Sequence, residues 1–246
     1  GEPYLRMLPD VHHERGLRCA DCHPMTSLHG TGNGARGCIE CHPSPSREVP
    51  EHAIGEHLDK LACVACHAAW AAQEYGTFLV RPDGPEAEAA FAPLPSWGSW
   101  KKSAHLKRQD APPLGLDGNG NVTPIRPRLL LFATDVSRGW ENRLLAAEWR
   151  PTSPHTVRRG SVACGGCHGN LRRFLLEPDD ERLFPLELDG LALRSYWNAQ
   201  GQSVAGGAFF PLDRYQAMDM KSPTAVREVL RQWQNFLDHA APRSAR

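Results

Sequence analysis

Four copies of one five-residue pattern, Cys-X-X-Cys-His, constrain this chain more than any other feature of its sequence. The copies begin at Cys19, Cys38, Cys63 and Cys164. They contain all eight cysteines, so no cysteine is left for another purpose. Three copies crowd into residues 19–67, and the fourth stands alone at residues 164–168. The chain therefore repeats one chemical site four times.

The spacing of the pattern suits a covalently attached haem. Two cysteines one helical turn apart can form thioethers with the two vinyl groups on one edge of a porphyrin, and the next histidine then lies under the iron. Four haems c are predicted, bound through Cys19, Cys22, Cys38, Cys41, Cys63, Cys66, Cys164 and Cys167. Their proximal iron ligands are predicted to be His23, His42, His67 and His168.

Zinc is the competing interpretation, because four Cys-X-X-Cys pairs could form two tetrahedral zinc sites. Such sites do not require a histidine directly after each second cysteine. The chain has only 12 histidines, yet all four pairs are followed by one. The pattern therefore favours haem.

The second axial ligands must come from the eight other histidines. His12, His57 and His155 lie six to nine residues before a motif, and His29 precedes a glycine that lets the backbone turn near a porphyrin. These four are the predicted distal ligands, with His52 and His105 in reserve. Which histidine serves which haem is left open, since a short flexible stretch could reach its own haem or a neighbouring one.

Methionine is the alternative distal ligand, and it raises the reduction potential of a haem. The chain has four methionines and an excess of histidines. Mostly bis-His haems of low potential are therefore expected.

These motifs make the chain resemble the multihaem cytochromes c, a family recognised by its repeated haem-binding pattern. The resemblance covers residues 12–67 and 155–168. It implies that upstream histidines such as His12 and His155 ligate a neighbouring haem. It also implies electron transfer to redox proteins, or along copies of the same chain in a filament or oligomer.

Composition points to a loop-rich fold, because the chain has 22 Gly and 21 Pro. The expected fold class is mostly irregular, with short α-helices and small β-hairpins around haems that form much of the core. Three segments are expected, and together they form one compact unit. They are a three-haem segment at 1–80, a proline-rich wrap and β-hairpin at 81–154, and a fourth-haem segment at 155–246.

Local patterns predict several elements. A helix is expected over Glu56–Tyr75, a short one at Glu86–Phe91 within a proline-rich wrap, and a strand over Arg128–Val136. A dense turn signal at 116–121 precedes that strand, and a second hairpin is expected in 183–205 with its turn at 198–201. The C-terminal helix is predicted to begin at an N-cap Ser222, with its apolar stripe on the core.

Charge and hydropathy exclude some functions. The 28 basic and 28 acidic residues balance, which argues against a nucleic-acid binder, and haem propionates would add negative charge. The apolar runs are too short to cross a bilayer. The start at Gly1 is interpreted as that of an exported protein whose signal has been removed, so a periplasmic or extracellular location is expected.

Three functions fit these patterns. An electron carrier through closely spaced haems is favoured. The alternatives are a reductase of a nitrogen or sulfur oxyanion and a haem subunit of a larger redox complex. A reductase would keep one haem position open beside cationic donors, for which Lys101, Lys102 and His105 are the candidates.

Overall fold

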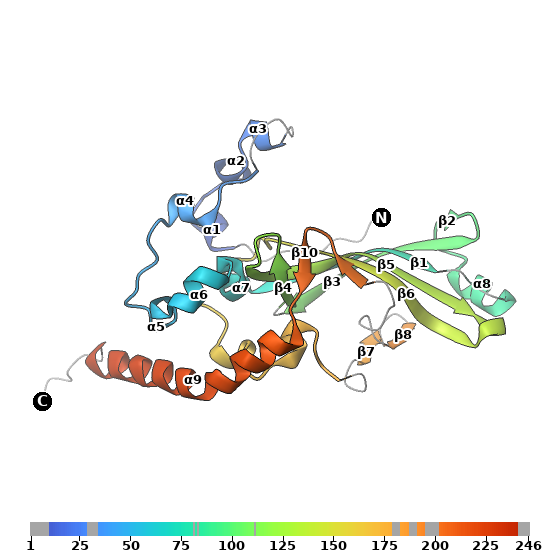
Figure 1. Ribbon diagram of the computed structural model, residues 1–246. Helices are drawn as coiled ribbons and strands as arrows, with labels where there is room; N and C mark the ends of the chain where they lie inside the picture. The colour runs from blue at the N-terminus through green and yellow to red at the C-terminus, as the bar shows by residue number, and fades with distance from the viewer. Residues whose placement is uncertain are drawn as a thin grey trace, which may run out of the picture.

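The computed structural model describes most of the chain. The described residues are 10–28, 34–80, 82, 84–110, 112–178, 183–186, 191–194 and 202–240. A group of short helices, a large β-sheet and one long C-terminal helix make up this part of the chain (Figure 1).

Seven short helices occupy the first part of the chain. They are α1 (Val11–Glu14), α2 (Cys19–Cys22), α3 (Met25–Leu28), α4 (Cys38–Cys41), α5 (Pro50–Ala53), α6 (Gly55–Lys60) and α7 (Cys63–His67). Figure 1 shows α2, α3 and α4 projecting away from the sheet, whereas α7 lies against it. Three of the seven helices contain the two cysteines of a motif.

Residues inside the motifs help to start their own helices. The Asp21 carboxylate accepts a hydrogen bond from the Arg18 N–H at 2.6 Å, and Glu40 accepts one from the Gly37 N–H at 2.7 Å. Such bonds satisfy N–H groups that a helix start leaves without an intrahelical acceptor. The variable positions of these two motifs therefore support the single turn that the cysteine spacing needs.

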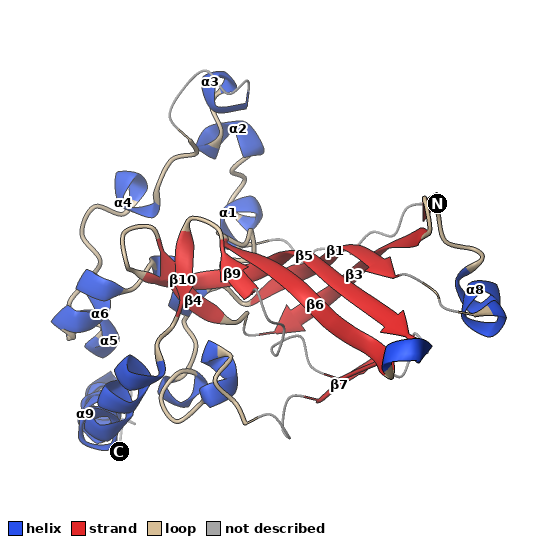
Figure 2. Cartoon of the chain, turned by 45° about the vertical axis from the view of Figure 1, so that its right-hand side comes forward, coloured by secondary structure: helices blue, strands red, loops and turns tan. Residues whose placement is uncertain are grey.

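An eight-stranded sheet follows (Figure 2). Its strands are β1 (Trp70–Val80), β2 (Ser96–Trp97), β3 (Trp100–Asp110), β4 (Leu114–Asp117), β5 (Val122–Asp135), β6 (Trp140–Pro151), β9 (Gln202–Val204) and β10 (Gly207–Phe209). The strand order is β10-β4-β5-β1-β3-β2, and β6 pairs with β5 and β9. β1 and β5 pair in parallel, as do β6 and β9, and the remaining pairs are antiparallel.

Smaller elements complete the described chain. They are α8 (Pro85–Phe91), the 3-10 turns η1 (Val136–Arg138), η2 (Cys164–Gly166) and η3 (Leu171–Phe174), and a separate hairpin of β7 (Leu183–Leu186) with β8 (Leu191–Arg194). The fourth motif begins on η2.

A hydrophobic cluster joins the third and fourth motifs to the sheet. Its buried members are Ala65, Leu114, Leu116, Val122, Phe174, Phe210 and Tyr215. The Phe174 ring lies 4.7 Å from that of Phe210 and 5.4 Å from that of Tyr215, centroid to centroid. Cys167 packs against the same cluster. The polypeptide therefore has a core of its own beside these two motifs.

Helix α9 (Leu212–Ala240) begins earlier than predicted. Ser222 and Pro223 lie inside it, so the prediction of an N-cap at Ser222 is wrong. The Ser222 hydroxyl donates to the Met218 carbonyl at 2.7 Å, a bond within the helix. In the predicted apolar stripe Val229 is buried, whereas Leu230 and Leu237 are exposed.

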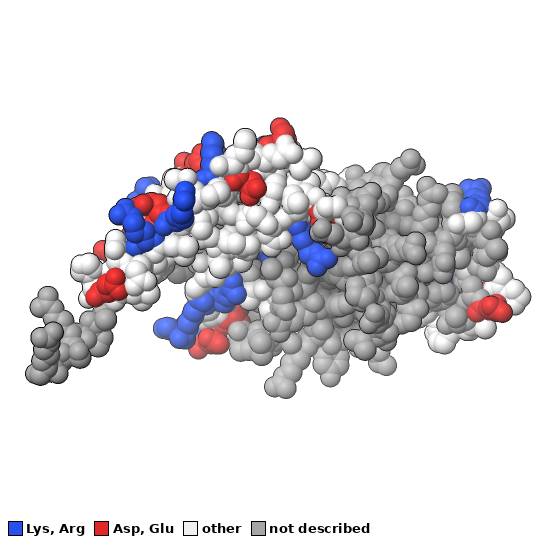
Figure 3. All heavy atoms as spheres, turned by 90° about the horizontal axis from the view of Figure 1, so that it is seen from below, with Lys and Arg blue, Asp and Glu red and all other residues white. Residues whose placement is uncertain are grey.

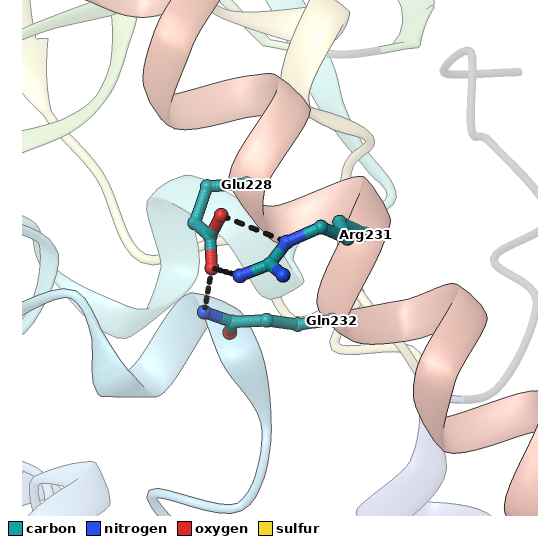
Figure 4. Close-up of polar contacts among 3 residues, drawn as sticks. All are labelled: Glu228, Arg231 and Gln232. Carbon is teal, nitrogen blue, oxygen red and sulfur yellow. Dashed lines mark hydrogen bonds and ion pairs between the residues drawn. The ribbon is translucent and has the colours of Figure 1, made fainter.

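Polar contacts support the exposed side of α9. Figure 4 shows the Glu228 carboxylate accepting hydrogen bonds from Arg231 at 2.8 and 3.1 Å and from Gln232 at 3.1 Å. Figure 3 shows basic and acidic side chains interspersed over the described part of one face of the molecule. This distribution agrees with the balanced charge of the chain.

Other local predictions had mixed outcomes. The helix at Glu86–Phe91 and the strand after the 116–121 turn are confirmed by α8 and β5. The continuous helix over Glu56–Tyr75 is wrong, since α6, α7 and the start of β1 divide that stretch. The predicted turn at 198–201 lies outside the described residues.

The sheet differs most from the sequence-based expectation. Strand β3 occupies part of the stretch expected to be a proline-rich wrap. The small hairpins that were expected are largely replaced by one sheet with strands of up to 14 residues. Long-range pairing of β3 with β1 supplies order that the local sequence pattern does not show.

Candidate functional site

Each motif places its two cysteines and its histidine on one turn of backbone. The His23 N–H donates to the Cys19 carbonyl at 2.8 Å, and the His42 N–H donates to the Cys38 carbonyl at 2.8 Å. The fourth motif has the equivalent bond from the His168 N–H to the Cys164 carbonyl at 2.9 Å. Side chains at positions i, i+3 and i+4 of such a turn share one face, so one ligand could contact all three.

Every motif histidine faces a histidine from outside the motifs. The pairs are His23 with His155, His42 with His12, His67 with His52, and His168 with His57. Their ring centroids lie 5.9, 6.3, 6.0 and 6.0 Å apart, respectively. We call these pairs, with their motif cysteines, sites 1 to 4 in the order of the motifs.

The spacing of the rings fits a metal ion between them. Two imidazoles on opposite sides of one metal ion, each bonded at about 2.0–2.1 Å, have ring centroids about 6 Å apart. Ordinary aromatic pairs also occur at such distances. The pairing rule favours a shared metal ion, because all four pairs combine one motif histidine with one other histidine. A single iron in a covalently attached porphyrin could be held at each site.

Hydrogen bonds orient the rings at sites 3 and 4. The His67 Nδ1 lies 2.8 Å from the Gly160 carbonyl, and the His168 Nδ1 lies 2.6 Å from the Ser222 hydroxyl oxygen. Because that hydroxyl donates to Met218, its oxygen can accept from His168. Both bonds place a proton on Nδ1 and leave Nε2 free as a ligand, the arrangement common for metal-binding histidines.

The distal rings have similar partners at sites 2 and 3. The His52 Nδ1 lies 3.2 Å from the Ser46 carbonyl, and the His12 Nδ1 lies 3.7 Å from an Asp10 carboxylate oxygen. Asp10 also caps α1 by accepting from the His12 and His13 N–H groups at 2.9 and 3.1 Å. Asp10 therefore holds both the backbone and the ring of His12.

The electrostatics of site 4 favour neutral imidazoles. Burial lowers the pKa of His57. Burial and the neighbouring His57 also lower the pKa of His168. Neutral imidazole is the form that binds a metal ion. The lowered pKa values of His57 and His168 therefore favour the form of each ring that could bind a metal ion.

The predicted ligands differ in where the structure places them. His12, His57 and His155 each face a motif histidine, and so does His52, which was only a reserve candidate. His29 lies outside the described residues. His105 lies on β3 opposite Tyr75, and its side chain lies outside the described part.

Most distal histidines face the motif of another part of the chain. His12 precedes the first motif but faces His42 of the second. His57 precedes the third motif but faces His168 of the fourth. His155 precedes the fourth motif but faces His23 of the first. Site 3 alone among the four pairs takes both histidines from one local stretch, which begins with a turn that Pro50 starts in α5.

A chain of contacts holds the His155 segment in place. The Thr156 hydroxyl donates to the Trp70 carbonyl, and the Thr156 carbonyl accepts from the Ala69 N–H at 3.0 Å. The Val157 carbonyl accepts from the Val11 N–H at 3.0 Å. This segment therefore joins the start of β1 to α1, beside the histidine that faces His42.

Cysteine contacts connect neighbouring sites. The Cys38 thiol lies near the Cys63 thiol, and this neighbour lowers the pKa of Cys63 to about 6 and raises that of Cys38. Burial and the nearby Cys167 raise the pKa of Cys66 to about 11. Site 2 therefore adjoins site 3, and site 3 adjoins site 4.

The arrangement of ligands differs from that of a zinc site. A structural zinc ion takes four converging ligands. Among the described residues, no three His, Cys, Asp or Glu side chains form a group able to hold one metal ion. Eight of the described histidines form four facing pairs instead, which suits a cofactor that supplies the other four ligands itself.

The proposed cationic pocket is not brought next to a described histidine pair. The Lys101 amine donates to the Ser96 hydroxyl at 2.8 Å, and Figure 1 shows β2 at the end of the sheet remote from α6 and α7. The side chains of Lys102 and His105 lie outside the described part of the structure.

Comparison with known proteins gave no match to a protein family, to a curated protein or to a solved structure. None of the described helices combines the length and apolar character that crossing a membrane requires.

Proposed function

We propose that this chain is an extracytoplasmic tetrahaem c-type cytochrome that transfers electrons through four closely spaced bis-His haems. One observation carries the proposal: each Cys-X-X-Cys-His histidine faces a second histidine at the distance expected for two ligands of one iron. The motif cysteines would attach the four haems, and the paired histidines would hold the irons. When bound, haem supplies a one-electron couple between ferric and ferrous iron.

Surface side chains near the first two motifs support the same reading. Leu17, Met25 and Ile39 are 37, 65 and 70% exposed. Porphyrin faces would cover such residues and remove their apolar surface from water.

Electron transfer is favoured over reduction of a substrate at iron. Two histidines at one iron leave no position for a substrate, so catalysis would require one of them to leave. Cys38 lies near Cys63, and Cys66 lies near Cys167, so the attached edges of successive haems would be close together. Close edges favour electron transfer, because tunnelling falls steeply with distance.

The reduction of external partners is part of the proposal. Redox proteins, or further copies of this chain, would receive the electrons outside the cytoplasm. Added propionate charge would favour partners with basic surfaces.

Mass and spin state test this proposal together. The intact mass should exceed that of the polypeptide by four haems, and the oxidised protein should give only low-spin signals by electron paramagnetic resonance. The reduced protein should bind carbon monoxide poorly. Fewer than four covalent haems would overturn the cofactor assignment, and one stoichiometric carbon monoxide site would favour a reductase.

A further inference from the structure

A buried arginine lies between the third and fourth motifs. Arg173, on η3, is only 2% exposed. Its Nη2 donates to the carbonyl of Ala65, a residue inside the third motif, at 3.1 Å. Its Nε and Nη1 have no hydrogen-bond partner within the described part of the protein. A single carbonyl acceptor is little compensation for a buried guanidinium with five N–H donors.

The charge of Arg173 faces the cysteines of two different motifs. Its guanidinium interacts with the Cys167 sulfur, and Cys66 also acts on it. Burial lowers the pKa of Arg173, but a guanidinium remains charged in proteins. A charge this deeply buried is costly unless something compensates it. The cysteines that interact with it are those through which haems would be attached at sites 3 and 4.

We propose that Arg173 is a charge shared by sites 3 and 4 that raises the reduction potentials of both haems together. This inference rests on the proposed function. Reduction lowers the positive charge at the iron by one, so a fixed cation nearby favours the ferrous form. Because Arg173 lies beside Cys167 of the fourth motif and donates to Ala65 of the third, the two potentials shift in the same direction. The difference between the two reduction potentials, which drives electron exchange between these haems, is then little affected by Arg173.

Substitutions at this position separate charge from shape. Arg173→Gln removes the charge but keeps an N–H donor for the Ala65 carbonyl. Two of the four reduction potentials should fall by about 59 mV. For a one-electron couple this corresponds to a tenfold change in the equilibrium constant of reduction. Arg173→Lys keeps the charge. In this variant the same two potentials should differ from those of the unsubstituted protein by less than a third of the fall expected for Arg173→Gln. Arg227→Gln, on the exposed side of α9, should leave all four potentials unchanged.

Spectroelectrochemical titration of the four-haem protein measures these effects. A fall of two potentials in the Gln variant, with both retained in the Lys variant, supports the inference. No fall, a fall at a single haem, or equal falls in the Gln and Lys variants would overturn it. If the Gln variant does not fold, the Lys variant decides, because a role limited to shape would shift its potentials as well.

The result is distinguishable from failure of the proposed function. Covalent haem content and low-spin signals of the unsubstituted protein test that function directly. Unchanged potentials in a variant that still carries four low-spin haems would reject the role of Arg173 alone.

Discussion

Sites 1 and 2 differ from sites 3 and 4 in what surrounds them. Helices α2 and α4, which carry the first two motifs, bury no residue. In contrast, α7 of the third motif buries Val64 and Ala65, and Cys167 of the fourth packs on the hydrophobic cluster around Phe174. The same five-residue motif therefore occurs in two settings. At sites 3 and 4 the polypeptide contributes its own core, whereas the helices of sites 1 and 2 have no buried residue to pack.

The largest expected effect comes from removing a distal ligand. His52→Ala should convert one of four haems to high spin, because His52 is the histidine that faces His67 at site 3. Electron paramagnetic resonance and carbon monoxide binding measure the change. His155→Ala provides the same test at site 1.

His29→Ala is the matched control for these ligand variants. Four low-spin haems are expected, since every motif histidine already faces another residue. A high-spin haem in this control, with none in His52→Ala, would mean that His29 is a distal ligand and that His52 is not.

A core substitution should affect sites 3 and 4 more than sites 1 and 2. Phe174→Ala removes a ring that is 2% exposed and should cost about 3–5 kcal/mol in the free energy of unfolding. Chemical denaturation followed by circular dichroism measures this cost. Phe236→Ala, at a site 55% exposed on α9, should cost much less. Equal costs in the two variants would mean that the hydrophobic cluster does not stabilise the region of sites 3 and 4.

Ser222 gives a smaller effect confined to site 4. In Ser222→Ala the Nδ1 of the half-buried His168 loses its acceptor, which should cost about 1–3 kcal/mol. An imidazole without that bond is a weaker donor to iron, so one reduction potential should rise. Redox titration checks this, with Ser203→Ala on an exposed part of β9 as the control. A shift at more than one haem would contradict an effect through His168.

The smallest effect is expected at Asp10 of site 2. Asp10→Ala removes the cap of α1 and should cost about 0.5–2 kcal/mol. Burial raises the pKa of this carboxyl, but the His13 and His12 N–H groups outweigh burial and the pKa is lowered overall. The stabilisation is therefore present above the ordinary carboxyl pKa and is lost as the pH falls through the lowered value.

An acid titration of the low-spin signal of site 2 shows that loss. Unsubstituted protein should lose part of the signal at low pH, whereas Asp10→Ala should show a weaker signal without this acid step. Asp59→Ala, an exposed change on α6, should titrate like the unsubstituted protein. An acid step that persists in Asp10→Ala would assign it to another group.

The sequence predicts which residues form the sites better than how those residues pair. The motif spacing identifies the cysteines and four of the paired histidines. It does not identify their partners, because three of the four pairs join separate motifs through the tertiary fold. His52 had a weak local signal, since it lies in a short helix with Pro50 at its first turn. The strand β3 was missed because its many polar residues obscure the alternation that indicates a strand.

The pairing of His155 with His23 has a consequence for how the protein is made. Of the four motifs, the one that contains His23 is synthesised first, whereas its partner His155 follows the whole of β1 to β6. Closing so long a loop is entropically costly and slow. During biogenesis the first haem would therefore stay one ligand short until the sheet has folded. Completion of its coordination would then report that β1 to β6 have been assembled.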